Sequence, residues 1–508
     1  MKRARAFCKV KLGAPLTSLA ALAACGGAPE PILVPPPPEP APVASAGVAA
    51  PEDSLGPRPA VPPAAPPSVP TPEVLDGPGG SKIWLLSRPG LPLVSIAAVS
   101  RRGASSDPAG KVGVAALTAE MLEQGAGKLD AVAFTAALEE QGARLSSSAS
   151  RDASVVSAHM LADRFPKVVA LLCDAVARPR LAQADFARTH ALFVNDVRAR
   201  GDDPGRVAAL VTDAALFGVD SPLGRPIEGT VASAQSLTRA DVVAAHRAVW
   251  APEQVTFVVV GDVTTAAVQA ALTAGLEGWA RAKASPEPAA AAALPTPPRV
   301  VAVAREDAPQ VVMTVARRSL GPRDEGRAAL ELVALTLGGS FTSRLNQTLR
   351  EDHGWTYGAR ARLAARRAGG AFVARASIRA DALGDALRET RRVLDQMAED
   401  GPTAAEIDKA KALSRGETVD TLASRAHTLS ALVGFVALDL PPDTLGRDAA
   451  RQGGATPEVL RALAKQVSSA GATIVLVGPS AAIDAAVQAN ALGAVERRDA
   501  DGRPIAAR

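Results

Sequence analysis

Three strand-like segments in the first half of this 508-residue chain recur in the second half at almost the same distance. The offsets are 217, 218 and 217 residues, for the pairs Ser95–Arg102 with Val312–Ser319, Ser154–Met160 with Phe372–Ile378, and Val255–Gly261 with Ala472–Gly478. Apolar strands resemble one another in any protein, but that does not explain a shared offset. The repeat therefore predicts one domain duplicated within the chain.

Helical patterns follow these strands in both halves. Apolar residues recur at helical spacing over Gly113–Gln124, Asp130–Gln141, Arg164–Ala177, Gln183–Arg200, Arg327–Leu337, Ala382–Asp400 and Thr403–Asp420. Strands, hairpin-like connections and helices in this order predict an α+β fold. We expect two homologous domains, each a mostly antiparallel or mixed sheet packed against helices, arranged as a clam-like pair.

Proline-rich segments set the domain boundaries. Residues 29–78 contain 18 prolines, a composition typical of an extended, disordered spacer. A second break at 282–298 divides the rest almost in half. The predicted organisation is a signal at 1–25, a linker at 26–80, domains at 81–281 and 299–490 joined by 282–298, and a tail at 491–508.

The first 25 residues have a basic head and a short apolar body ending in Leu22-Ala-Ala-Cys25, which predicts a secretory signal. This ending resembles a bacterial lipobox, which implies lipidation of Cys25; an ordinary cleaved signal is the alternative. Because Gly26 is not aspartate, the resemblance implies an outer-membrane lipoprotein facing the periplasm. The membrane contact would be the lipid alone.

Charge and cysteine content argue against a nucleic-acid-binding protein and against a disulfide-bonded one. Without the five basic residues of the signal, 51 Lys and Arg stand against 52 Asp and Glu, so a nucleic-acid partner is not expected. With Cys8 removed and Cys25 lipidated, Cys173 would stand alone, so no intrachain disulfide is possible. Cys173 lies in an apolar run and is interpreted as a core residue.

The only tyrosine, Tyr357, lies seven residues after Arg350. A guanidinium and a phenol can together hold a peptide carbonyl or stabilise an oxyanion. The alternative is a helix-end arginine and a half-buried tyrosine. His353, between them, is more simply explained as a solvated turn residue. Arg101-Arg102 and Arg366-Arg367 are expected at strand ends in water, with an interface role as the alternative.

Several segments resemble the pitrilysin and insulinase family of inverted zinc peptidases, in order and spacing. They are Arg88–Val94, Gly110–Gly125, Asp202–Pro204, Val259–Val263 and Leu337–Asn346 running into Leu349-Arg350. The resemblance covers residues 82 to 480 and implies that family's two-domain fold.

The family's catalytic helix carries H-x-x-E-H, in which two histidines bind zinc and the glutamate activates water. Alignment puts the ligand positions on Ala116 and Glu120, the base position on Ala119, and the distal ligand at Asp196. No two of the five histidines are spaced for such a motif. The chain is therefore expected to bind no zinc and to have no catalytic residue of its own.

Arg350 and Tyr357 match the other half of the family's site, a pair that binds the substrate backbone. The resemblance implies a non-catalytic, substrate-binding subunit whose partner, a zinc-bearing family paralogue, completes a heterodimeric peptidase acting on extended peptides. A pseudoenzyme that binds or scaffolds at the cell envelope is the alternative. An active stand-alone hydrolase, the third possibility, would need tightly bound zinc.

Overall fold

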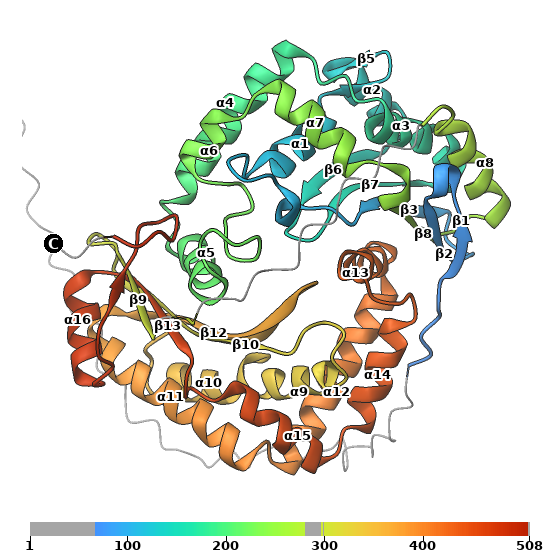
Figure 1. Cartoon of the computed structure of the whole chain (residues 1–508). Coiled ribbons are helices and arrows are strands. Elements are labelled where there is room, and N and C mark those ends of the chain that lie inside the picture. Colours follow the sequence, from blue (N-terminus) through green and yellow to red (C-terminus); the bar gives the residue numbers. More distant parts are fainter. Residues whose placement is uncertain (1–66, 280–295, 298, 506–508) are drawn as a thin grey trace, which may run out of the picture. The chain divides into compact units, whose positions relative to one another are not determined.

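The structure is a computed structural model that describes residues 67–279, 296–297 and 299–505 (Figure 1). The first half of the repeat builds a sheet of six strands. They are β1 (Glu73–Asp76), β2 (Lys82–Ser87), β3 (Leu93–Ser100), β6 (Arg144–Ala149), β7 (Ser154–Leu161) and β8 (Val255–Gly261), in the spatial order β1-β2-β8-β3-β7-β6. Two short strands, β4 (Gly125–Ala126) and β5 (Leu129–Asp130), form a separate ribbon.

The second half repeats this arrangement. Its strands are β9 (Val300–Ala304), β10 (Gln310–Ser319), β11 (Ala359–Arg366), β12 (Gly369–Arg379), β13 (Thr473–Gly478) and β14 (Glu496–Arg497), in the order β11-β12-β10-β13-β9-β14. The long strands β3 and β10 each lie between two antiparallel neighbours, and β8 and β13 each have a parallel neighbour beyond. The predicted α+β fold and the internal duplication are confirmed.

Helices cover the sheets. In the first half they are α1 (Val114–Leu122), α2 (Ala131–Glu140), α3 (Phe165–Ala177), α4 (Gln183–Arg200), α5 (Pro204–Phe217), α6 (Val231–Ser236), α7 (Arg239–Val249) and α8 (Thr265–Gly275). In the second they are α9 (Arg327–Gly338), α10 (Arg344–Asn346), α11 (Leu383–Asp400), α12 (Ala404–Ala423), α13 (Arg425–Ala437), α14 (Thr444–Gly454), α15 (Pro457–Ala464) and α16 (Ser480–Ala489). All seven helices predicted from the sequence are present.

Local signals explain where several helices begin and end. Asp130 accepts a hydrogen bond from the Ala133 amide and so caps α2. Thr403 and Glu406 form a reciprocal capping box at the start of α12. Gly401 ends α11 with a φ of +75°, a backbone conformation that favours glycine.

Each half contributes one helix to the sheet of the other. The helix α5 packs against the second sheet through Val207 and Val211, which contact buried valines of β9, β10 and β13. In return, α13 packs on the first sheet through Leu429 and Leu432, against residues of β2, β3 and β8 (Figure 1). Both sheets therefore have one face whose apolar side chains are covered from the other half.

Polar contacts reinforce this exchange and correct one expectation. Arg366 is only 8% exposed and pairs with Asp213 of α5, while the Arg367 amide donates to Asp152 at 3.0 Å. Arg102 is also buried, at 7% exposed. The expectation that these arginines lie in water is wrong for Arg102 and Arg366, whereas Arg101 is 40% exposed at its side chain. For Arg366 and Arg367, and for Arg101 through its 3.0 Å pair with Asp439, the alternative of an interface between halves is correct.

The structure also modifies two boundaries. The strand β1 pairs with β2 in register from Glu73 opposite Leu85, so the last part of the 26–80 linker is ordered, contrary to expectation. Within the tail, β14 adds to β9 in parallel. The predicted signal, Cys25 and all of 282–298 except residues 296 and 297 lie outside the described residues. Within the described ranges, no helix is both long and apolar enough to cross a membrane.

Candidate functional site

The helix α1 carries the positions aligned with the family's zinc motif. Its start is fixed by Asp107, whose carboxylate accepts hydrogen bonds from the amides of Gly113 (2.8 Å) and Ala115 (3.1 Å). Gly113 has a φ of +101°, and a Cβ there would lie 2.5 Å from the Glu228 carbonyl oxygen. A glycine is therefore required where the chain enters α1.

Ala116 and Ala119 of α1 are buried and present only methyl groups. Glu120, the remaining motif position, lies among three other acids: Asp196 of α4, Glu123 and Glu228. Burial, and then the charges of these acids, raises the pKa of Glu120 to about 7 from its ordinary value of 4.5. The structure thus brings Glu120 and Asp196 together, as expected from the alignment.

The donor set does not fit a catalytic zinc, which takes three protein ligands, usually with imidazole among them. Here the helix offers one carboxylate and two methyl groups. Among the residues that the structure describes, no group of three or more His, Cys, Asp and Glu side chains could hold a metal ion. What remains is a cluster of acidic side chains.

The strand β6 is the last strand of the first sheet, so one of its edges has no strand partner among the described residues. Ser146, Ser147 and Ser148 lie on it. A carboxylate oxygen of Glu123, from the end of α1, accepts a hydrogen bond from the Ser147 amide at 2.6 Å. An intramolecular acceptor thus occupies one of the amides that an added strand would use.

Arg350 lies on a π-helical turn, η5 (Gln347–Asp352), a local form that is frequent at functional sites. Its guanidinium carbon is 5.0 Å from the centre of the Phe341 ring, and its Nε is 3.3 Å from a Glu351 carboxylate oxygen. Tyr357 is 90% exposed and Phe341 is 73% exposed. The alternative of a half-buried tyrosine is therefore wrong.

The segment that carries these side chains is anchored at both ends. The Asn346 side chain donates to the carbonyls of Ser340 and Ala359 at 2.9 Å and accepts from the Ala359 amide at 2.8 Å. Trp355 donates its amide to Leu349 and stacks on His353 at 4.0 Å between ring centres. Tyr357 is thus displayed on an ordered loop, next to an exposed His353.

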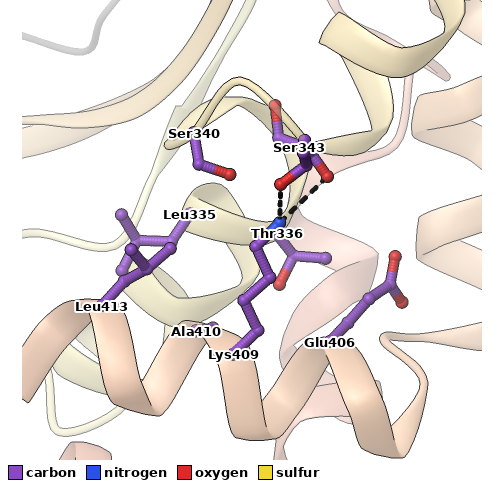
Figure 2. A pocket seen from close by; sticks show the side chains of 9 residues that line it. Leu335, Thr336, Ser340, Ser343, Glu406, Lys409, Ala410 and Leu413 are labelled. Atoms are coloured by element: carbon purple, nitrogen blue, oxygen red, sulfur yellow. Dashed lines mark hydrogen bonds between the residues drawn. The ribbon is translucent and has the colours of Figure 1, made fainter. Parts of the chain in front are cut away.

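A second set of contacts holds the start of this segment against α12 (Figure 2). Arg344 makes two hydrogen bonds of 2.7 Å with the Glu406 carboxylate, and Lys409 donates to the Thr342 carbonyl at 3.1 Å. The pocket between them holds about 20 Å³, enough for about one water molecule.

Two residues that shape the loop around Arg350 and Tyr357 were not predicted from the sequence. Phe341 contacts Arg350, and its only signal was an aromatic residue in a polar turn of a chain with 3% aromatics. Asn346 anchors the loop by hydrogen bonds from its side chain to the backbone of Ala359, 13 residues later in the sequence. Nothing in the local pattern distinguishes it from a solvated asparagine.

Models of two family domains match the chain. Insulinase (peptidase family M16) matches residues 83–230, and the peptidase M16 inactive domain matches residues 236–414. An uncharacterized zinc protease of Mycobacterium tuberculosis is 30% identical over 302 residues, which are 57% of this chain and 66% of that protein. One from Streptomyces coelicolor is 25% identical over 342 residues, 66% of this chain and 74% of that protein. The chain thus spans just under two thirds of the mycobacterial relative.

Solved structures share the fold. A peptidase M16 inactive domain from Pseudomonas fluorescens superposes with a TM-score of 0.75 at 24% identity, over 80% of this chain and 98% of that one. A protease from Helicobacter pylori gives 0.72 at 17% identity, over 81% and 100%. With the motif positions on α1 lacking zinc ligands, the chain belongs to the M16, insulinase-like peptidase family as a member of its non-catalytic kind.

Proposed function

We propose that this chain is the substrate-binding subunit of a heterodimeric zinc peptidase at the bacterial cell envelope. The observation that carries the proposal is the contrast between two sites. The motif positions of α1 offer one carboxylate and two methyl groups, whereas Tyr357 is 90% exposed on an anchored loop that also carries Arg350, paired only with its neighbour Glu351 among the described residues.

Arg350 and Tyr357 would hold a carbonyl oxygen of an extended peptide through N–H and O–H donors. The peptide would add as a strand to a free sheet edge, for which β6 is the candidate. A family paralogue with an intact H-x-x-E-H motif would supply the metal, which polarises the scissile carbonyl and activates water. Lipidation at Cys25 and the proline-rich linker would tether the pair to the outer membrane.

The test is a reconstituted pair of this chain and such a paralogue, assayed on a fluorogenic peptide. Tyr357→Phe and Arg350→Ala should each lower kcat/KM on the order of 100-fold, because each removes one donor to the developing oxyanion. The melting temperature should not change, since Tyr357 is 90% exposed. Arg388→Ala on α11, which removes only an exposed ion pair with Asp385, is the matched control.

Unchanged kinetics in both variants would remove Arg350 and Tyr357 from the proposal. If no zinc-bearing paralogue co-purifies with the chain from native membranes, the heterodimer is refuted and a scaffold role takes its place. Stoichiometric zinc in the purified chain alone would instead indicate a stand-alone hydrolase.

A further inference from the structure

A set of three arginines lies on one face of the second sheet, next to the loop that carries Tyr357. Along the outermost strand β11, Ala359 and Ala361 point into the core, while Arg360 and Arg362 alternate with them and are exposed. On the neighbouring strand β12, Arg375 lies directly opposite Arg360. We call Arg360, Arg362 and Arg375 the basic strip.

The three arginines of the basic strip are not balanced by acidic side chains of their own. Burial, and then the charge of Arg362, lowers the pKa of Arg375, while Asp213 raises it. Asp213 already pairs with Arg151 at 3.1 Å and with Arg366. In the part of the chain that the structure describes, no ion pair joins Arg360 or Arg362 to an acid.

This arrangement costs stability, since like charges directly opposite on neighbouring strands repel. Arg375 has only neutral acceptors of its own, the Thr314 hydroxyl at 3.2 Å and the Gly205 carbonyl at 3.4 Å. A carboxylate bound against the strip would relieve the repulsion, because guanidinium groups pair with carboxylates through two parallel hydrogen bonds.

The geometry of the strip matches an extended peptide. Arg360 and Arg362 are two residues apart on one strand, so their side chains leave the sheet about 6.6–7 Å apart. Alternate side chains of an extended peptide have the same spacing. Tyr357 precedes Arg360 by three residues, which limits their Cα separation to about 10–11 Å.

We propose that the basic strip selects extended peptides with acidic side chains at two alternate positions, a few residues from the carbonyl held by Arg350 and Tyr357. The inference rests on the proposed function and adds a substrate class to it. Arg360 and Arg362 act as specificity residues, and Arg375 reinforces their positive charge.

The test measures fluorescence anisotropy of labelled ten-residue peptides with the purified full-length chain. Three peptides differ only in a central Glu-Thr-Glu, Gln-Thr-Gln or Lys-Thr-Lys. At low salt the Glu peptide should bind about tenfold more tightly than the Gln peptide, and the difference should shrink at high salt. The Lys peptide should bind most weakly.

The double variant Arg360→Gln and Arg362→Gln should abolish the preference for Glu, so that the Glu and Gln peptides bind with equal affinity. Arg388→Gln with Arg392→Gln, two exposed arginines of α11, is the matched control and should keep the preference. Tyr357→Phe should weaken both the Glu and the Gln peptide alike, because it acts on the peptide backbone.

The outcomes distinguish the selection of acidic peptides from the proposed peptide-binding function. Equal binding of the Glu and Gln peptides, or a preference that survives in the double variant, would overturn the acidic selection and leave the proposed function standing. Failure of all three peptides to bind would overturn the peptide-binding role itself, and this inference with it.

Discussion

At the scale of single residues, Glu120 occupies one of the two positions on α1 that the alignment assigns to zinc ligands. A carboxylate stands where the family places an imidazole, and it faces Asp196, Glu123 and Glu228. These acids repel the Glu120 carboxylate in a half-buried site, although Arg200 pairs with Glu228 at 3.2 Å. With its pKa raised to about 7, Glu120 is only partly ionised at neutral pH.

This residue makes stability depend on pH. Since the pKa of Glu120 is raised from 4.5 to about 7, the folded state binds the proton more tightly than the unfolded state. The free energy of unfolding should therefore fall as the pH rises from about 4.5 to about 7, with no further loss from this group above that range. The contribution is about 1 kcal/mol, because solvent reaches part of the side chain.

Glu120→Gln removes this dependence. By urea unfolding, the variant should exceed the parent by about 1 kcal/mol at pH 8 and match it at pH 4. Glu140→Gln on the exposed side of α2 should match the parent at both pH values. A variant less stable than the parent at pH 8 would contradict the acidic repulsion described here.

At the scale of secondary structure, the free edge of β6 is partly blocked by Glu123, the residue that follows α1. Glu123, at the end of α1, accepts a short hydrogen bond from the Ser147 amide. A peptide that adds to this edge must displace the carboxylate before its own carbonyl can bind there. In the proposed function, the contact would therefore compete with a bound peptide.

Glu123→Ala should tighten binding of an extended peptide by about threefold to tenfold, because the displacement costs about the energy of one hydrogen bond. Fluorescence anisotropy with a labelled peptide measures this change. Glu139→Ala, an exposed change on α2, should leave the affinity as it is. Unchanged or weaker binding by the Glu123 variant would show that β6 is not the edge used.

The sequence predicted regular elements well because each obeys local rules. The helix α4 begins and ends at the predicted Gln183 and Arg200, and the repeated strands occupy equivalent positions in both sheets. The resemblance predicted Arg350 and Tyr357 as a binding pair, and their role stays a prediction. Their exposure, and the ring of Phe341 beneath Arg350, depend on tertiary contacts that no local pattern records.

The packing of α5 and α13 could not be predicted from the local sequence pattern. Both are apolar enough to be buried, but periodicity cannot tell which sheet a helix will cover. Each packs on the sheet of the opposite half, through contacts far apart in the sequence. The same limit explains the buried Arg366, whose partner Asp213 lies 153 residues away.

At the scale of the whole described chain, Asp213 links the two halves. It pairs with Arg151 of the first half and Arg366 of the second, which are 10% and 9% exposed at their side chains. Asp213→Ala would leave two buried guanidinium groups without their counter-ion. We expect a loss of about 2–3 kcal/mol in the free energy of unfolding.

Thermal or urea unfolding measures this loss. Asp202→Ala is the matched control, because its carboxylate is 87% exposed and 3.8 Å from Arg305, and it should cost less than about 0.5 kcal/mol. Equal effects of the two substitutions would contradict a central role for Asp213.

The reciprocal exchange of α5 and α13 also sets the order in which the protein can mature. The first sheet is complete in its strands by residue 261, yet its apolar face waits for Leu429 and Leu432. A nascent chain therefore exposes this apolar surface until most of its length has been synthesised. A truncation after the first domain should yield an aggregating fragment in place of a smaller working protein.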